Sequence, residues 1–314
     1  MNGWSRSSRS WSGPSGTLLT MASSLSTATA TLIGGGAIVL WSALAVLTTA
    51  AGPVPPFQMT AMAFALGFFL ALAKWLAGGE RVAAHFRWPP AVWALGIGGL
   101  FGFHALYFIA LALAPPVEAN LINYLWPLLI VVFSGLLPGE RLRWWHLAGA
   151  LAGLAGSALL VGGGTRGFRP EFAAGYLAAL GAALAWSSYS VLSRRFGEVP
   201  TDAVGAFCGA TALLAFLVHL VVETTYTPQG AEWLAILALG LGPVGAAFYL
   251  WDVGMKRGDI RALGALSYLT PLLSTLLLIA FGRGRLTPQV AAAVGLIVGG
   301  AIVAGRDLWR RKRI

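Results

Sequence analysis

Two apolar stretches of the chain carry polar residues and a proline at the spacing i, i+3, i+4 and i+7. Their members are Asn120, Asn123, Tyr124 and Pro127 in the first stretch, and Ser267, Thr270, Pro271 and Ser274 in the second. This spacing places each set on one face of a helix. Polar groups in an apolar helix line a cavity or join helices by hydrogen bonds, because exposure to lipid is costly. We interpret both faces as walls of a ligand-binding cavity, with helix association as the alternative.

Pro127 and Pro271 occupy matching places on these two faces. A proline inside a helix removes one backbone hydrogen bond and leaves a carbonyl group without its donor. Kinks in helices are found at such points. The two prolines are therefore predicted to act as hinges.

Aromatic residues, one serine and one histidine provide the remaining candidates. They are Trp41, Ser42, His104, Tyr107, Trp126, Trp186, Tyr189 and Tyr249, which join Asn123, Tyr124, Ser267 and Thr270 in the predicted substrate-binding set. Aromatic walls with a few hydroxyl and amide groups suit an amphipathic ligand that has a flat apolar part. His104 is predicted to bind a carboxylate or an amine of the ligand, and proton transfer or plain packing are its alternative roles.

The elements that position these residues must be membrane helices. The chain is 57% hydrophobic and 10% charged, whereas a soluble domain has about 25% charged residues. Apolar stretches of about 20 residues, long enough to cross a bilayer, follow one another along the chain. They are 28–50, 57–78, 91–113, 117–137, 145–163, 174–194, 203–222, 232–254, 259–281 and 288–305. Because backbone groups find no water in lipid, each stretch is predicted to be a helix.

The second half of the chain repeats the first. The seven residues from Asn123 and the seven from Ser267, 144 positions later, are identical at five positions. Trp41-Ser42 recurs as Trp186-Ser187, and the pair Gly149 and Gly153 recurs as Gly295 and Gly299. We expect these glycines to allow close packing of helices inside the molecule.

The repeat and the ten stretches together predict an all-α membrane protein with ten transmembrane helices. Five helices in each half is an odd number, so the second half, 170–306, must be inverted relative to the first, 27–165. Many secondary transporters have this architecture, with the substrate site between the repeats. The sequence therefore predicts transport by alternating access.

Catalysis, a metal site and a cofactor are not indicated. The four histidines have no metal-ligand spacing, and the sequence has no His-Glu-x-x-His motif, nucleophile elbow or phosphate-binding loop. We therefore expect neither an enzyme nor an ATP-driven pump subunit. Acidic residues in the spans are scarce, with Glu118 and Asp252 near span ends. Facilitated transport is predicted, and proton antiport through His104 or Glu118 is the alternative.

Lys and Arg residues predict the orientation. With a cytoplasmic N-terminus, 17 of the 21 lie on the cytoplasmic side, as in most membrane proteins. Both termini are therefore predicted to be cytoplasmic.

Residues 1–26 are interpreted as a disordered tail, with Met21 as an alternative start, and 307–314 as a basic tail at the anionic leaflet. The dispersed charges do not indicate nucleic-acid binding, and the single cysteine, Cys208, excludes a disulfide framework. A monomer in the lipid bilayer is predicted.

The chain resembles the drug/metabolite transporter superfamily in Trp41-Ser42, in Trp186-Ser187 and in the repeated Tyr-Leu-x-Pro-Leu-Leu. The run from Pro116 to Val131 is most similar to the EamA-type aromatic amino-acid exporters of bacteria. This resemblance implies two inverted five-helix repeats and the export of aromatic and other neutral amino acids across the inner membrane.

The chain departs from this pattern at one place. Gly139-Glu140-Arg141 has as its counterpart Gly282-Arg283-Gly284-Arg285, without the glutamate that many members carry there. This departure weakens any role for a pair of such glutamates. Transport of another small metabolite or drug, with or without proton coupling, is the main alternative function, and a membrane enzyme is a weaker one.

Overall fold

The computed structural model describes residues 25–161, 169–280 and 285–307. Within these ranges the regular elements are all helices. The predictions for residues 1–24 and 308–314, and the departure at 282–284, lie outside the described residues. Eight described helical segments are long and apolar enough to cross a membrane. They are Thr27–Ala50, Pro56–Ala77, Pro90–Leu113, Pro116–Ser134, Pro170–Phe196, Ala203–Val222, Glu232–Arg257 and Ile260–Ala280.

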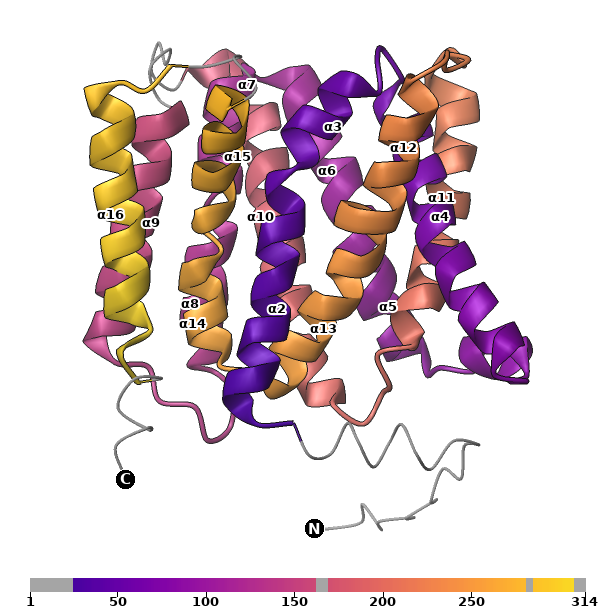
Figure 1. Ribbon diagram of the computed structural model, residues 1–314, viewed down its shortest axis with the longest axis horizontal. Helices are drawn as coiled ribbons and strands as arrows, with labels where there is room; N and C mark the ends of the chain where they lie inside the picture. The colour runs from indigo at the N-terminus through magenta and orange to yellow at the C-terminus, as the bar shows by residue number, and fades with distance from the viewer. Residues whose placement is uncertain (1–24, 162–168, 281–284, 308–314) are drawn as a thin grey trace.

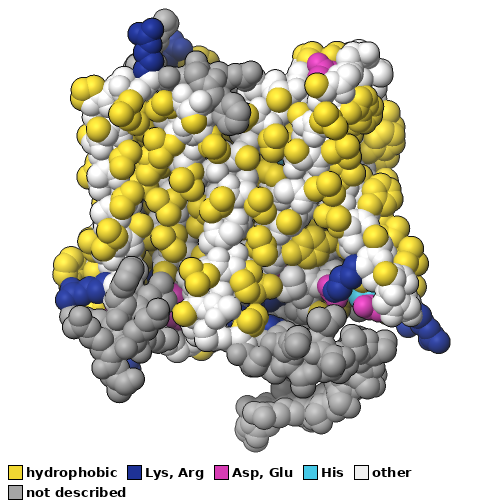
Figure 2. Space-filling model, viewed as in Figure 1, with side chains coloured by type: hydrophobic (Ala, Val, Ile, Leu, Met, Phe, Trp, Pro, Cys, Tyr) yellow, Lys and Arg dark blue, Asp and Glu magenta, His cyan; other side chains and the backbone are white. Residues whose placement is uncertain are grey.

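Two further apolar helices are shorter, Trp144–Leu160 and Pro288–Ala304. Figure 1 shows that they lie side by side and run between the same two ends of the bundle as the other helices. The first described helix begins and the last ends at the bottom of this view, which we name the lower end; the opposite end is the upper end. Hydrophobic side chains cover the middle of the visible face, and Lys and Arg lie near both ends (Figure 2). Such a surface is expected for contact with lipid between two aqueous phases.

Four of the spans are single helices or nearly so. These are α4 (Pro56–Ala77), α9 (Trp144–Val161), α11 (Ala203–Val222) and α16 (Pro288–Ala304). A fifth, α10 (Ala173–Leu192), is flanked by the 3-10 turns Pro170–Phe172 and Ser193–Phe196. A short 3-10 helix, Val82–Phe86, follows α4. Proline occupies the first turn of α4 and α16, where its missing N–H costs no helical hydrogen bond.

The other five spans are interrupted, which the sequence analysis did not predict. Their segments are α2 (Thr27–Ser42) and α3 (Leu44–Ala50); α5 (Pro90–Ile97) and α6 (Phe103–Leu113); α7 (Pro116–Asn123) and α8 (Trp126–Ser134); α12 (Glu232–Leu241) and α13 (Ala247–Arg257); α14 (Ile260–Leu266) and α15 (Leu269–Ala280). Two interruptions are π-helical turns, Gly98–Gly102 and Gly242–Ala246. These turns lie 144 positions apart, at the offset of the sequence repeat.

The π turns occur where the sequence favours a break in α-helical bonding. Pro243 in the second turn lacks an N–H group and cannot complete the α-helical ladder. In the first turn, Gly99 packs directly against Tyr189, so closely that a Cβ atom there would lie 2.3 Å from the Tyr189 ring. π turns are rare and concentrate at functional sites.

The helices pack in pairs that join the two halves of the chain. The main partners are α2 with α13, α6 with α10, α4 with α11, α8 with α14, and α9 with α16. Gly34 and Gly254 let the backbones of α2 and α13 touch, because a Cβ atom on Gly34 would lie 2.9 Å from Gly254 Cα. Each pair thus contains one helix from either side of residue 165.

The expectation for the repeated glycines holds for the first pair only. Gly149 and Gly153 on α9 face close neighbours, with Gly300 O only 2.4 Å from a Cβ atom built on Gly149. Gly295 and Gly299 on α16 have no atom within 4 Å of such a position. Gly300 forms the contact instead, so the close approach of α9 and α16 uses the residue next to the predicted one.

Candidate functional site

Four tryptophans meet at the centre of the bundle. They are Trp41 on α2, Trp126 on α8, Trp186 on α10 and Trp251 on α13. Every pair among them has ring centroids between 5.1 and 6.5 Å apart. None is more than 8% exposed. We name this group the tryptophan cluster; it joins helices from both halves of the chain.

The ring nitrogens of two of these tryptophans fix their orientation. Trp41 Nε1 donates a hydrogen bond of 2.9 Å to the carbonyl of Pro243, inside the second π turn. Trp251 Nε1 donates one of 3.0 Å to the hydroxyl of Ser190. Buried indole N–H groups usually have such partners. The π turn at Gly242–Ala246 therefore supplies an acceptor that positions Trp41.

A wall with hydrogen-bonding groups rises from the tryptophan cluster along α6. Phe103 contacts Trp186 at 5.7 Å between ring centroids and stacks on Tyr107 at 5.9 Å. The Tyr107 hydroxyl donates to Asn120 Oδ1 at 2.5 Å. His104 Nδ1 lies 2.7 Å from the Leu100 carbonyl. Because a carbonyl only accepts, Nδ1 carries the hydrogen, which leaves Nε2 as the acceptor of the neutral ring.

Two polar atoms of the predicted binding residues on α7 and α15 have no partner among the described residues. They are Asn123 Oδ1 and Thr270 Oγ1, both buried. An unpaired buried polar atom costs about 1–3 kcal/mol. Such atoms are suited to a ligand that supplies the missing hydrogen bonds, so Asn123 and Thr270 remain candidate binding residues.

Three predicted residues are engaged elsewhere in the structure. Ser42 and Ser267 donate to carbonyl groups of their own helices, at 2.6 Å to Val39 and 2.7 Å to Leu263. The Tyr249 hydroxyl donates to Gly67 on α4 at 3.2 Å. On α13 it is Trp251, three residues after Phe248, that completes the tryptophan cluster, whereas Tyr249 packs toward α4.

The two predicted hinge residues lie directly after helix breaks. Pro127 is in the first turn of α8, which follows the break at Tyr124–Leu125, and Pro271 is in the first turn of α15. In a first turn, the N–H that proline lacks has no helical acceptor. The sequence analysis placed both prolines inside continuous helices, so the structure moves the break to the residues just before them. At these two breaks the Tyr268 hydroxyl donates to the Tyr124 carbonyl at 3.1 Å.

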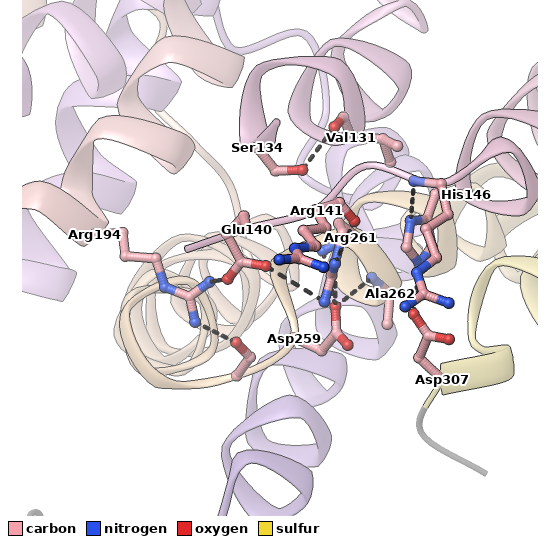
Figure 3. A network of polar contacts seen from close by, with 12 residues as sticks. Val131, Ser134, Glu140, Arg141, His146, Arg194, Asp259, Arg261, Ala262 and Asp307 are labelled. Carbon is pink, nitrogen blue, oxygen red and sulfur yellow. Dashed lines mark hydrogen bonds and ion pairs between the residues drawn. The ribbon is translucent and has the colours of Figure 1, made fainter. Parts of the chain in front are cut away.

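The lower end of the bundle is closed by a network of charged residues (Figure 3). Glu140, in the connection between α8 and α9, binds Arg194 at 2.7 Å and Arg261 at 3.3 Å. Arg194 also donates to the Gly258 carbonyl at 2.5 Å, and Arg261 to the Arg141 carbonyl at 2.8 Å. We name this group the lower network. It joins Glu140 of the first half to two arginines of the second.

Asp259 extends the lower network to α2. Its carboxylate caps α14 by accepting from the N–H groups of Arg261 and Ala262, at 3.1 and 3.2 Å. Its own N–H donates to Thr31 Oγ1 at 2.8 Å. Charge-assisted hydrogen bonds of this kind are stronger than neutral ones. The contacts of Asp259 and Arg261 thereby hold together the lower part of α2, the start of α14 and the α8–α9 connection.

The upper end is fastened in a different way. The Glu223 carboxylate accepts from the N–H groups of Phe57 and Gln58 at the start of α4, at 2.9 and 3.0 Å. A negative charge at this place is favoured by the helix dipole. In the same loop the Tyr226 hydroxyl donates to Glu232, and this bond raises the pKa of Tyr226. These contacts tie the start of α4 to the end of α11 and the loop that follows it.

Burial differs between the two ends of the interior. Trp251, Met255, Ile260 and Leu263, at the lower end, are completely buried. His104 and Tyr107, in the wall above the tryptophan cluster, are only partly buried. These side chains of α13 and α14 are thus closely packed, whereas two residues of the α6 wall keep part of their surface exposed.

The sequence analysis did not identify the lower network, although it noted Glu140 and counted the arginines as topology signals. Ion pairs between loops more than 50 positions apart leave no periodic pattern in a sequence. The spacing Phe248, Trp251, Asp252 on α13 is a helix face that favours Trp251 over Tyr249, and this signal was available.

The sequence profile of the EamA-like transporter family matches the chain twice, over residues 28–162 and 173–306. The chain belongs to the EamA-like transporter family. The resemblance inferred from Trp41-Ser42, from Trp186-Ser187 and from the run that begins at Pro116 is therefore confirmed.

Individual relatives of this EamA-like transporter agree with that assignment. The aromatic amino acid exporter YddG of Ancylobacter novellus is 56% identical over 282 residues, which are 89% of this chain and 98% of the relative. The exporter of the same name from Escherichia coli is 26% identical over 297 residues, 87% of this chain and 96% of the relative. A crystal structure of a 56% identical protein has a TM-score of 0.85 and covers 89% of this chain and 98% of its own.

Proposed function

We propose that this EamA-like transporter exports aromatic and other neutral amino acids across a bacterial inner membrane by alternating access. The observation that carries the proposal is the tryptophan cluster bordered by His104, Tyr107 and Asn123. Edge-to-face contacts with indole rings favour a flat aromatic side chain. The charged main chain of an amino acid needs hydrogen-bonding groups beside that ring, and the α6 wall provides them. The names of its relatives support this ligand class.

The proposed frame is ten membrane crossings in two inverted five-helix repeats, 27–165 and 170–306. The double match of the family profile supports two repeats. The two π turns, spaced by 144 positions, support the same relationship at the level of the backbone. In Figure 1, α9 and α16 run between the two ends of the bundle, which supports counting them as crossings. The transporter is proposed to act as a monomer in the bilayer.

The lower end is proposed to face the cytoplasm. It carries the lower network, and the described cations of the connections at this end include Arg141, Arg194, Lys256 and Arg261. Cytoplasmic loops are enriched in Lys and Arg. Under this orientation both termini are cytoplasmic, as the sequence analysis predicts.

We propose that the structure corresponds to an outward-facing state, because the lower network joins the two halves of the chain at the lower end. We infer that amino acids enter from the cytoplasm when the lower network separates and the upper wall closes. The helix breaks before Pro127 and Pro271 are proposed as the flexible points. Trp126 of the tryptophan cluster directly follows the first break, and the Tyr268 hydroxyl joins the second break to the first. Broken helices at mid-membrane are common in secondary transporters.

Transport is proposed to be facilitative, driven by a high internal concentration of amino acid. The wall above the tryptophan cluster offers a histidine, a phenol, an amide and a hydroxyl rather than a pair of carboxylates. Proton antiport through His104 is the alternative that the experiment must separate. Efflux of labelled phenylalanine from proteoliposomes, measured with and without an imposed pH gradient, tests both. Saturable efflux without a gradient supports facilitated export; efflux that requires the gradient and disappears in His104→Ala establishes proton coupling; and no efflux in either condition contradicts the proposed function.

A further inference from the structure

A second polar site lies directly below the tryptophan cluster. Asp252, next to Trp251 on α13, pairs with Lys256 one turn later, with 2.9 Å between Oδ2 and Nζ. The Asp252 side chain is 3% exposed and the Lys256 side chain 8%. The Thr201 hydroxyl donates to the same Asp252 oxygen at 2.7 Å, and Lys256 Nζ donates to the Val199 carbonyl at 2.9 Å. Both charges are therefore buried inside the protein.

The pair borders a small cavity between α5, α10, α11 and α13. Tyr189, Ser193, Phe196, Phe207, Asp252 and Lys256 contribute to its lining. The Tyr189 hydroxyl is buried and has no hydrogen-bond partner among the described residues. Its ring contacts Trp186 at 5.3 Å, so the cavity adjoins the tryptophan cluster. An unpaired phenol beside a buried ion pair indicates a site that is incomplete without a ligand.

Stability alone does not explain this ion pair. Desolvation of two buried charges often cancels their attraction, and well-packed apolar residues can replace such pairs at no loss of stability. The two charged groups, an ammonium and a carboxylate, are the same groups that the main chain of an amino acid carries. A zwitterion can therefore take the place of each partner without leaving a buried charge unpaired.

We propose that Asp252 and Lys256 form a recognition site for the zwitterionic main chain of the substrate, reached from the lower end. This inference rests on the proposed function. When the lower network opens, the substrate ammonium binds Asp252 and its carboxylate binds Lys256, with the Tyr189 hydroxyl as a further donor to the carboxylate. The side chain then points toward the tryptophan cluster. The net charge of the site does not change at any stage.

The lower network is connected to this site. Arg194, which binds Glu140, also donates from Nε to the Lys256 carbonyl at 3.4 Å. Loss of the Glu140 contacts would release the last turn of α13, where Lys256 lies. Access to the ion pair is therefore linked to the same contacts that close the lower end.

The experiment compares three labelled ligands in proteoliposomes. They are L-phenylalanine, phenethylamine, which lacks the carboxylate, and 3-phenylpropionate, which lacks the ammonium. Lys256→Met should reduce phenylalanine flux about tenfold or more, because one charge-assisted contact is lost. The same variant should raise the flux of phenethylamine relative to that of phenylalanine. Asp252→Asn should instead raise flux of 3-phenylpropionate relative to phenylalanine. Lys74→Met, which breaks the surface pair with Asp202, is the matched control and should leave the preferences unchanged.

The double variant Asp252→Leu with Lys256→Met distinguishes recognition from structure. It replaces both charged side chains with apolar ones, which leaves no buried charge unpaired and should allow the protein to fold. The proposal predicts that phenylalanine flux nevertheless stays low. Restored phenylalanine flux with the wild-type preference would show that the pair is structural and would overturn the proposal. Equal losses for all three ligands in both single variants would also overturn it. Absence of phenylalanine flux in the wild-type protein would count against the proposed function itself, and is seen before any variant is compared.

Discussion

The phenol of Tyr268 donates a hydrogen bond to the carbonyl of Tyr124, its counterpart 144 positions earlier in the chain. In the proposed inverted repeat, these two equivalent residues would lie beside the two-fold axis that relates the halves. Both also occur at the helix breaks before Pro127 and Pro271. The contact therefore joins the two proposed flexible points to each other.

Replacing Tyr268 by Phe should weaken this connection. The Tyr124 carbonyl at the α7–α8 break would lose its donor, at a cost of about 1 kcal/mol in the free energy of unfolding. Thermal unfolding of the purified protein in detergent measures the loss as a lower Tm. Tyr176→Phe, which alters a contact near the upper end at Arg169, is the control. A Tyr268→Phe protein with unchanged Tm and unchanged flux would show that the contact is incidental.

Pro127→Ala and Pro271→Ala should slow transport more than they weaken binding. Each substitution restores an N–H group that can bond back across the break and extend the second helix segment. The helix would become stiffer at the point that has to bend. Rates of phenylalanine exchange and equilibrium binding, measured on the same preparations, separate the two effects. Pro288→Ala, at the start of α16 and away from any break, is the matched control. Wild-type exchange rates in both single variants and in the double variant would exclude a hinge role.

Trp186→Leu should weaken phenylalanine binding roughly tenfold or more. The apolar contact that the indole provides contributes a binding free energy of about 1.5–3 kcal/mol. Binding of leucine should change less than binding of phenylalanine. Competition against labelled phenylalanine measures both. Trp144→Leu removes a tryptophan that is 68% exposed on the surface and should have little effect. A uniform loss for all amino acids would indicate that the tryptophan cluster stabilises the fold rather than the ligand.

Glu140→Gln should favour the state that is open at the lower end. Arg194 would lose its charged partner and Arg261 would keep only Asp259, whereas contacts within each half would remain. A cysteine placed at the buried position Val191, in a Cys208→Ser background, reports this change through its rate of reaction with a membrane-impermeant thiol reagent added at the lower end. Glu171→Gln breaks an exposed pair with Arg169 and serves as the control. A labelling rate equal to that of the parent would show that the lower network does not control access.

Most of the fold follows from the sequence because span length and hydrophobicity are local properties. Eight of the predicted spans have the length and composition for crossing, and the remaining two are apolar helices of shorter length. The π turns at Gly98–Gly102 and Gly242–Ala246 were not predicted, since one extra residue in a turn hardly alters an apolar stretch. The distance between the two turns, 144 positions, is nevertheless the offset of the sequence repeat.

The candidate site was only partly predictable. Trp41, Trp126 and Trp186 stood out as deep tryptophans, and the structure brings them together. The sequence analysis predicts Tyr249 in place of Trp251, because residue type alone does not give the direction of each side chain on α13. The Asp252–Lys256 pair and the lower network depend on contacts among helix ends, and single-sequence patterns do not specify which helix ends meet.

Counterflow of labelled phenylalanine is the measurement that tests the central claim most directly. Proteoliposomes that contain the purified chain and a high internal concentration of unlabelled phenylalanine are diluted into labelled phenylalanine. The predicted result is a transient, saturable accumulation of label that needs no pH gradient. Unlabelled tryptophan or tyrosine added outside should reduce it by competition. Empty liposomes provide the background. Accumulation no greater than that background, for phenylalanine and for the other neutral amino acids, would contradict the account.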